Sequence, residues 1–351
     1  MKKILLSIML VAIGQMSIAQ VVQENEAAVV YYMPKNELSI TLEYDVVHQT
    51  PGIFYQYASR YLGTKDVVTD AKTTYVLTDV KSELITGADT NRAFKVIASQ
   101  DVKEQLITLS DDGRLLGYNV GLDNAPLQAV SEKQEMRGER EAKSDGYAGL
   151  MPLLEEQFMA TSTAKMAEGA AKQIYRIRET RLNLLAGEVE HVPADGEAMK
   201  QVLAELDKQE QALAELFIGK TVVRHASKTL IYEPRGNVNK EMVCRFSLHN
   251  GVVAADDLSG EPVYLSIKAE KQTLQENILQ GSKVPATSQL YYNLPGRADL
   301  SLVYKDTQYV QATYQIAQFG VAIPIAKQLF ASRRTPVIHI NPQTGNILSI
   351  Q

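Results

Sequence analysis

The sequence has a single cysteine and no excess of basic residues, and each of these shortages excludes a class of protein. Cys244 is the only cysteine among 351 residues, so the chain forms no internal disulfide and has no cysteine pair for a structural zinc site. Acidic residues outnumber basic ones by 41 to 36, for a formal net charge of -5. Because nucleic-acid binding rests on clustered Lys and Arg, we predict no nucleic-acid partner.

Cys244 lies in a segment in which apolar and polar residues alternate, the pattern of a strand with one buried face. The apolar positions are Met242, Cys244, Phe246 and Leu248. A cysteine on such a face is far more often a buried thiol than a reactive one. We therefore expect Cys244 to be buried and unreactive.

Long apolar runs are absent except at the start of the chain. Met1 to Ala19 has the form of a signal peptide, with two lysines, an apolar stretch and the small-residue pattern Ser17-Ile18-Ala19. Cleavage before Gln20 would remove both lysines and change the net charge from -5 to -7. No later run reaches the ~20 apolar residues of a membrane helix. We predict an exported protein without a membrane span, in the periplasm or at the periphery of the outer membrane.

Motifs that mark common catalytic and cofactor sites are missing too. The sequence contains no HExxH, no GxSxG elbow, no P-loop and no GxGxxG fingerprint. Asp256-Asp257 with Ser259-Gly260 could offer oxygen ligands to calcium, but an aspartate-rich glycine turn is more often only a turn. The histidines do not have metal-ligand spacing; they are His48, His191, His225, His249 and His339. We predict no metal and no cofactor.

One class of enzyme stays open despite these absences. Glycoside hydrolases use two carboxylates from distant positions, which leave no spacing signature. The chain has 17 tyrosines, and these suit strand faces and a carbohydrate- or protein-facing surface alike. A glycan-active hydrolase, with its carboxylates in a tyrosine-lined cleft between two β regions, is therefore the alternative to a non-catalytic binding protein.

Residues 147–219 have the periodicity of two helices that fold back between Gly187 and Gly196. In the second helix, apolar residues recur every seven positions, and each is followed three positions later by another member of the row. The predicted buried row is Met199, Val202, Leu206, Gln209, Leu213 and Leu216, with Leu203, Glu210 and Phe217 beside it. The matching row of the first helix is Met166, Ala170, Ile174, Ile177, Arg181 and Leu184. We predict an antiparallel helical hairpin whose helices end at Gly187 and Gly219.

Basic residues cluster with an aromatic on the first of these helices: Tyr175, Arg176, Arg178 and Arg181. Such a group could bind an anion or a partner. It could also form ion pairs with Glu179 and with the acidic second helix, which is the commoner role of charges on a helix. These four residues are the one candidate interaction site in the sequence.

Alternating sequence on both sides of the hairpin predicts an α+β, mainly β fold. Leu38 to Val46 is the strongest strand pattern, and Pro34 is expected to end a strand that begins at Ala28. Separate strands are also expected at Thr73 to Thr78 and Arg92 to Ser99. The predicted divisions are a signal peptide (1–19), an N-terminal β-rich domain (20–130), a charged linker (131–146), the helical hairpin (147–219) and a C-terminal β domain (220–351).

The two β regions resemble each other. Tyr31-Tyr32-Met33-Pro34 and the strand after it are echoed by Tyr291-Tyr292-Asn293-Leu294-Pro295 and its following strand. Each region also ends in a strand, a glycine turn and a strand, with Gly113 and Gly345 in comparable places. The spacings differ by a residue or two, so duplication and chance similarity both stay open.

Several short motifs together give the chain a family resemblance. They are Tyr32 with Pro34-Lys35, Phe54 to Gly63, Arg178-Glu179 with Arg181, Leu184 and Gly187-Glu188, Leu206-Asp207 with Glu210 and Leu216-Phe217, and Ala317-Gln318-Phe319-Gly320. The chain resembles an uncharacterised domain-of-unknown-function family of exported proteins from Gram-negative anaerobes. That resemblance implies no activity and no site. We therefore predict a non-catalytic exported envelope protein with a structural or binding role towards an envelope protein or a glycan.

Overall fold

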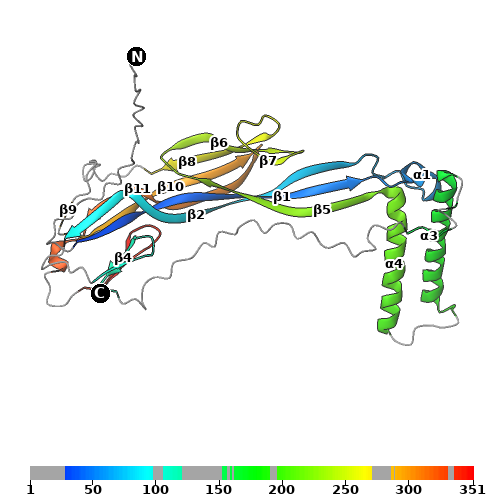
Figure 1. Cartoon of the computed structure of the whole chain (residues 1–351), viewed down its shortest axis with the longest axis horizontal. Helices are drawn as coiled ribbons and strands as arrows, with labels where there is room; N and C mark the ends of the chain where they lie inside the picture. The colour runs from blue at the N-terminus through cyan, green and yellow to red at the C-terminus, as the bar shows by residue number, and fades with distance from the viewer. Residues whose placement is uncertain are drawn as a thin grey trace, which may run out of the picture.

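The computed structural model describes residues 28–97, 106–120, 152–155, 159, 162–189, 196–270, 286–287, 289–330 and 336–351. The predicted signal peptide (1–19) and charged linker (131–146) lie outside these residues. Within them the fold is α+β and mainly β, with two long helices that pair as a hairpin, as predicted (Figure 1).

Three sheets contain the strands. The long sheet has the order β5-β1-β2-β9, formed by Lys220–Tyr232, Ala28–Thr50, Lys72–Ile97 and Ala286–Thr287. The five-stranded sheet has the order β11-β10-β8-β6-β7, formed by Thr307–Pro324, Tyr291–Tyr304, Glu261–Ala269, Val238–Ser247 and Gly251–Val253. The small sheet has the order β13-β12-β4-β3, formed by Ile347–Ile350, Ile338–Ile340, Leu115–Tyr118 and Ile107–Leu109. Short helical turns occur at η1 (Tyr55–Tyr57), α1 (Ala58–Tyr61) and η4 (Lys327–Leu329).

β1 and β2 are much longer than the sequence predicts, with 23 and 26 residues. The expected strand end at Pro34 is wrong, because β1 runs through it after a shift of register between Tyr32 and Met33. β5 pairs with β1 only from Leu38 onward, so β1 has an open edge at Pro34, where a proline is tolerated. The two strands expected between residues 73 and 99 are likewise the single strand β2, which pairs with β1 along nearly its whole length.

The main core lies between the long sheet and the five-stranded sheet. Alternate residues of β1 point into it, and Leu38, Ile40 and Leu42 are fully buried, which confirms the alternation in the sequence. Cys244 is buried in the same core, and burial raises the pKa of its thiol to about 11. Its predicted role as an inert thiol is consistent with that environment.

Strands from the two predicted β regions share sheets. β5 follows the helical hairpin in sequence but pairs with β1, and β4 pairs with β12. The predicted boundaries at residues 130 and 220 therefore separate segments that are hydrogen-bonded neighbours. Periodicity shows which residues of a strand face the core, but it does not show which strand lies alongside.

Two glycine turns dock against two long strands in the same way. The N–H of Tyr32 in β1 donates to the carbonyl of Gly113 at 2.9 Å, and the N–H of Asn293 in β10 donates to the carbonyl of Gly345 at 2.8 Å. Both glycines have positive φ, +82° and +75°. The matching contacts favour the duplication interpretation of the repeated motif.

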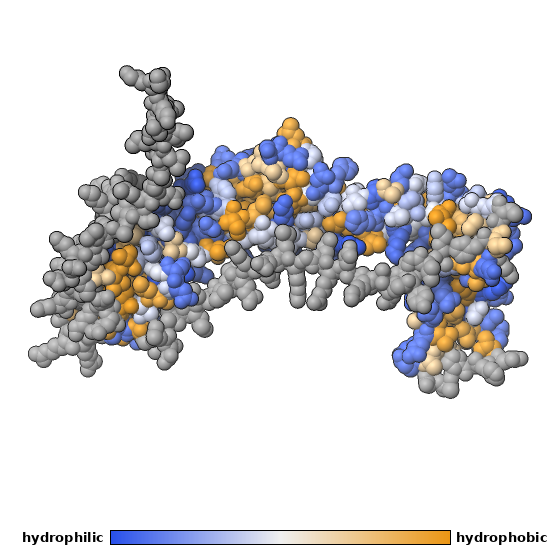
Figure 2. Space-filling view, in the orientation of Figure 1, coloured by the Kyte–Doolittle hydropathy of each residue, from blue (hydrophilic) through white to orange (hydrophobic). Residues whose placement is uncertain are grey.

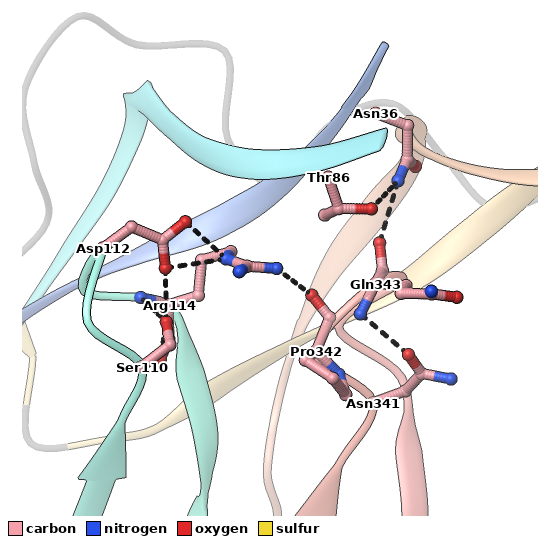
Figure 3. Close-up of polar contacts among 8 residues, drawn as sticks. All are labelled: Asn36, Thr86, Ser110, Asp112, Arg114, Asn341, Pro342 and Gln343. Carbon is pink, nitrogen blue, oxygen red and sulfur yellow. Dashed lines mark hydrogen bonds and ion pairs between the residues drawn. The ribbon is translucent and has the colours of Figure 1, made fainter. Parts of the chain in front are cut away.

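A polar cluster with the buried side chains of Arg114 and Asn36 at its centre joins these two turns (Figure 3). Arg114 donates through Nε to both carboxylate oxygens of Asp112, at 2.9 and 2.7 Å, and through Nη1 to the carbonyl of Pro342 at 2.6 Å. Asn36, from β1, donates to the carbonyl of Gln343 at 3.0 Å. Partial burial acts to raise the pKa of Asp112, but hydrogen bonds from Arg114 and Ser110 outweigh it and hold that pKa below its ordinary value. The polar groups satisfy one another, so the cluster is structural.

The remaining part of the long sheet forms an arm. β1, β2 and β5 continue beyond the two-sheet core and reach the helices α3 (Thr163–Ala186) and α4 (Gly196–Ile218) at the other end of the molecule (Figure 1). β5 starts at Lys220, directly after α4 ends. The arm thus places the helical hairpin far from the body, which is the part of the molecule where the other two sheets pack against the long sheet (Figure 1).

Candidate functional site

The helical hairpin begins and ends with standard caps. The side chain of Ser162 accepts a hydrogen bond from the N–H of Lys165, and Gly187 closes α3 in the left-handed conformation with φ +72°. Gly219 follows α4 with φ +84°, and a Cβ there would lie 2.6 Å from the carbonyl oxygen of Thr50. Both predicted helix ends are confirmed. Only glycine lets α4 stop this close to the end of β1.

A separate core joins the hairpin to the arm. Small side chains of α3 face large side chains of α4, and Phe54 packs on Phe217 with ring centroids 5.4 Å apart. The buried residues are Phe54, Ala58, Leu153, Ala167, Ala170, Ala171, Ile174, Ile177, Leu213 and Phe217. The hairpin therefore has its own apolar core at the arm end, as the complementary rows predicted.

The predicted row on α4 is wrong at two of its six positions. Leu206, Leu213 and Leu216 pack in this core, but Val202 is 38% exposed and Gln209 is exposed. The second buried row is the one containing Phe217, which the sequence analysis placed beside the stripe. An α-helix has 3.6 residues per turn, so positions three and four away both lie near a buried residue, and the partner helix decides between them.

Glu210 of α4 precedes Phe217 by seven residues and so lies on the same face of the helix, where two arginines of α3 bind it. Arg178 donates through Nε to Oε1 of Glu210 at 2.6 Å, and Arg181 donates through Nη2 to Oε2 at 2.5 Å. Arg181 also pairs with Asp207. Partial burial acts to raise the pKa of Glu210, but the hydrogen bonds from both arginines outweigh it and hold the pKa below its ordinary value.

The structure thus places the four candidate interaction residues as follows. Arg178 and Arg181 face the acidic helix α4, while Arg176 is exposed. Tyr175 is 50% exposed, its hydroxyl donates to the carbonyl of Tyr61 at 2.7 Å, and its ring centroid lies 5.7 Å from the guanidinium carbon of Arg178. Two of the three guanidinium groups are therefore engaged with carboxylates inside the hairpin.

An exposed apolar stripe runs along α3 next to the buried row. Of its members, only Tyr175 was predicted as an interaction residue. Tyr175, Leu182 and Leu185 recur with Arg178 at steps of three and four residues, so they share one face of the helix. Leu182 and Leu185 are 65% and 64% exposed. Hydrophobic surface is visible on the helical pair in Figure 2. The helical spacing of these three residues is present in the sequence, but the longer apolar row beside it gave the stronger pattern and was the one predicted.

A hollow of about 490 Å³ lies at the base of the hairpin, between α4 and the start of β5. Its lining is Gln49, Asp66, Val67, Val68, Thr69, Asp70, Lys72, Gln211, Glu215, Ile218, Gly219, Lys220 and Thr221. Three carboxylates line it, but no tyrosine does. The space between the β regions, where the tyrosine-lined cleft was expected, is occupied by the apolar core of the two large sheets.

The candidate calcium turn is held by its own hydrogen bonds. Oδ1 of Asp257 accepts from the N–H of Ser259 at 2.8 Å, and Arg245 donates to the carbonyls of Ala255 and Gly260 at 3.0 and 2.9 Å. The backbone hydrogen bond from Ser259 lowers the pKa of Asp257. Across the described residues, no group of three or more His, Cys, Asp or Glu side chains is arranged to hold a metal ion. The geometry here is that of a turn.

Among the helices of the described residues, none combines the length and the apolar character that crossing a membrane requires.

A search of curated proteins found no match, and a search of solved structures found none either. A family model does match, over residues 27–348, which span the long sheet, the helical hairpin and both other sheets. The chain therefore belongs to the family described as Domain of unknown function (DUF4831).

Proposed function

We propose that the chain is a non-catalytic exported protein of the cell envelope, periplasmic or at the periphery of the outer membrane, whose helical hairpin binds a protein partner. The observation that carries this proposal is the exposed stripe of Tyr175, Leu182 and Leu185 at the end of the arm. Leucines that are about two-thirds exposed and in line on one helix form an apolar surface that association would bury. Each buried side chain of this size contributes roughly 1.5–3 kcal/mol.

The position of the stripe supports a binding role. The arm holds the hairpin away from the three-sheet body, and the hairpin has its own core and its own ion pairs. A partner could therefore contact the distal half of α3 without meeting the sheets. Export rests on the predicted signal peptide, residues 1–19, and on the family resemblance.

A glycan-active hydrolase is the second candidate, and the hollow at the hairpin base is the observation that favours it. Asp66, Asp70 and Glu215 line the hollow together with amide, hydroxyl and ammonium groups, a lining suited to a hydroxylated ligand. A glycosidase needs two carboxylates about 5–10 Å apart across a bound sugar. On this candidate the catalytic pair would come from these three residues.

Crosslinking in intact cells, followed by purification of the protein, tests the first candidate. The comparison is between the natural chain and the double variant Leu182→Glu/Leu185→Glu, with Leu258→Glu as the matched control because Leu258 is 82% exposed in the loop between β7 and β8. We expect a crosslinked species of discrete mass that disappears in the double variant and persists in the control. A crosslinking pattern that all three proteins share would contradict the proposal.

A hydrolysis screen on envelope and dietary glycans tests the second candidate. Turnover that Asp66→Asn, Asp70→Asn or Glu215→Gln abolishes would replace the non-catalytic proposal with the hydrolase.

Mass spectrometry of the protein from cells tests export, since a processed chain should begin at or near Gln20. An intact Met1 in the envelope fraction would contradict the processing step.

A further inference from the structure

We propose that β11 pairs with β11 of a second copy of this chain along its open edge, so that the five-stranded sheets of two molecules join into one continuous sheet. This inference goes beyond the proposed function, because it concerns the body and not the helical hairpin. Three features of β11 support it: its place at the end of the sheet, the open backbone along its first half, and its lack of charge.

β11 is a long strand at the end of its sheet. It pairs with β10 on one side, and among the described residues no strand pairs with its other side. The opposite end of the same sheet is β7, which has only three residues. Every second residue of an edge strand directs its N–H and carbonyl away from the sheet. β11 therefore offers main-chain hydrogen bonds to an added strand.

Side chains of the body cover this edge at Ala317 but not before it. The N–H of Ala317 donates to Oδ1 of Asn36 at 2.5 Å, and its carbonyl accepts from Arg92 and Asn293 at 3.2 and 2.9 Å. For residues 307–315, the described part of the chain shows no hydrogen bond to the backbone of β11 besides the ladder to β10. The open stretch of the edge is therefore 307–315.

The absence of charge distinguishes β11 from the long edges of the other large sheet. None of its 18 residues is charged. β2 has four charged residues between Lys72 and Glu83, where β9 does not cover it, and β5 has basic residues at steps of four: Lys220, Arg224 and Lys228. Charged side chains on an edge strand hinder pairing with another strand. β2 and β5 have this protection, and β11 lacks it.

The side chains of the open stretch are arranged in a polar and an apolar row. Val310 and Tyr314 pack at the margin of the main core and are half-buried, so an added strand would cover more of each. The exposed residues of the other face are polar and uncharged: Gln308, Gln311, Thr313 and Gln315. A partner strand should match both rows.

A second copy of β11 matches them. Amide and hydroxyl groups both donate and accept, so each can bond to its own kind. Such pairs exist in the chain: Gln308 donates through Nε2 to Oε1 of Gln311 at 2.8 Å, and the hydroxyls of Thr41 and Thr229 lie 2.9 Å apart on neighbouring strands. Selecting a charged partner strand would require the opposite charge, which β11 does not have. An uncharged strand meets its own copy without repulsion.

An antiparallel pairing about a two-fold axis at Ala312 spans the open stretch. It places Gln311 of each copy opposite Thr313 of the other, so that polar residues face polar ones. It also places Val310 opposite Tyr314, so that the apolar rows of both copies continue across the interface.

Sedimentation equilibrium over a range of concentrations tests the inference. The natural chain should form a dimer, and Gln311→Lys/Thr313→Lys should weaken the association about tenfold or more, because four lysines would meet across the axis. Ser227→Lys/Thr229→Lys is the matched control, at exposed positions of β5, and should associate as the natural chain does. Gln311→Glu/Thr313→Glu should also weaken the dimer. Mixing the lysine and glutamate variants should restore it, since opposite charges then face each other.

A cysteine at the axis gives a second measurement. The natural Cys244 is buried, so mild oxidation should link two copies of Ala312→Cys by a disulfide and leave the natural chain unlinked. Thr229→Cys, on the edge strand β5, should also stay unlinked. Circular dichroism confirms that each variant is folded.

A natural chain that stays monomeric at every concentration overturns the inference, and so does a dimer that both charge variants leave intact. If the chain is monomeric but a photoreactive group at Gln311 captures another protein in cells, the edge binds a different strand and the second-copy inference fails. In cells this dimer adds a crosslinked species of twice the chain mass that does not depend on Leu182 or Leu185. The proposed function of the hairpin is therefore tested separately.

Discussion

The two long antiparallel strand pairs of the molecule, β1 with β2 and β10 with β11, begin alike and end differently. Both have two adjacent tyrosines near their first residues, shift register near a proline and donate a backbone hydrogen bond to the carbonyl of a turn glycine. β10 then turns back at Lys305, whose φ is +52°, after 14 residues. β1 continues for 23 residues, gains β5 as a neighbour and reaches the helices.

The difference teaches what the extra sequence adds. The similar first part of each strand pair belongs to the body, because the same local motif makes the same contact with a glycine turn. The added length of β1 and β2, together with β5 and the two helices, builds the arm and the hairpin. Residues that stabilise the body should therefore be distinguishable by experiment from residues that stabilise the hairpin.

The largest expected effect breaks the hairpin and spares the body. Leu213→Asp would place an unpaired charge in the core of α3 and α4, and we expect it to destabilise the hairpin by about 4 kcal/mol. Hydrogen exchange should rise in α3, α4 and the segment around Phe54, and stay unchanged in β8 and β10. Lys208→Ala, on the exposed face of α4, is the control and should change stability by under ~0.5 kcal/mol. Faster exchange throughout the sheets would mean that arm and body unfold together.

A second change compares the two halves of the body at their buried asparagines. Asn293→Ala removes hydrogen bonds to the carbonyls of Ala317 and Thr344 and one from Arg92, and Asn36→Ala removes the bond from the N–H of Ala317 and two others. We expect each to lower the free energy of unfolding by about 3 kcal/mol, since buried partners lose their hydrogen bonds.

Urea denaturation measures both costs, with Thr41→Ala as control because the hydrogen bond of Thr41 to Thr229 is exposed. Each asparagine loses three side-chain hydrogen bonds, and each donates to a carbonyl of the same turn, that of Gln343 or Thr344, so the two values should agree within about 1 kcal/mol. A negligible cost for one asparagine and a large cost for the other would argue against that comparison.

Alanine substitutions at the two turn glycines should destabilise the protein less, and the structure predicts which of the two costs more. A Cβ at Gly345 would lie 2.7 Å from Cβ of Asn293, whereas at Gly113 the nearest atom is 3.0 Å away in the ring of Tyr32. Positive φ costs both alanine substitutions about 1–2 kcal/mol, but a ring can move more easily than a backbone-linked Cβ. We therefore expect Gly345→Ala to lower the midpoint of thermal unfolding more than Gly113→Ala. The reverse order would show that the close approach to Cβ of Asn293 does not set the cost of the substitution.

The smallest effect depends on pH and concerns the hairpin alone. The pKa of Glu210 is held below its ordinary value of 4.5, so its charge stabilises the folded state above that value. The contribution is lost as the pH falls through the lowered pKa of the folded protein. Glu210→Gln should cost about 1 kcal/mol at pH 7, and the difference from the natural chain should shrink in acid. A difference that stays constant between neutral and acid pH would show that the ion pairs contribute nothing.

Local features of the fold could be predicted from the sequence. The alternation around Ile40, the helix ends at Gly187 and Gly219 and the buried face containing Cys244 all follow from periodicity and capping, because each depends on residues close in the chain. The repeated Tyr-Tyr motif also pointed to comparable strands in both β regions.

Features that depend on distant residues could not be predicted. The pairing of β5 with β1 and of β4 with β12 follows from competition among strands, which no local pattern encodes. On α4, Phe217 is buried against Phe54 and Glu210 is bound by Arg178 and Arg181, and all three partners lie outside the helix. The candidate site shows the same limit: the cluster on α3 was visible in the sequence, but its division into an engaged and an exposed part was not.

A photoreactive side chain placed at Leu185 in living cells tests the central claim most directly, with the same group at Leu258 as reference. Both positions are exposed, at 64% and 82%, so only a real partner surface should distinguish them. The account predicts a crosslinked species of one discrete mass from position 185 and none from position 258. No adduct at position 185, or equal and heterogeneous adducts at both positions, would contradict the claim that the hairpin is the binding surface.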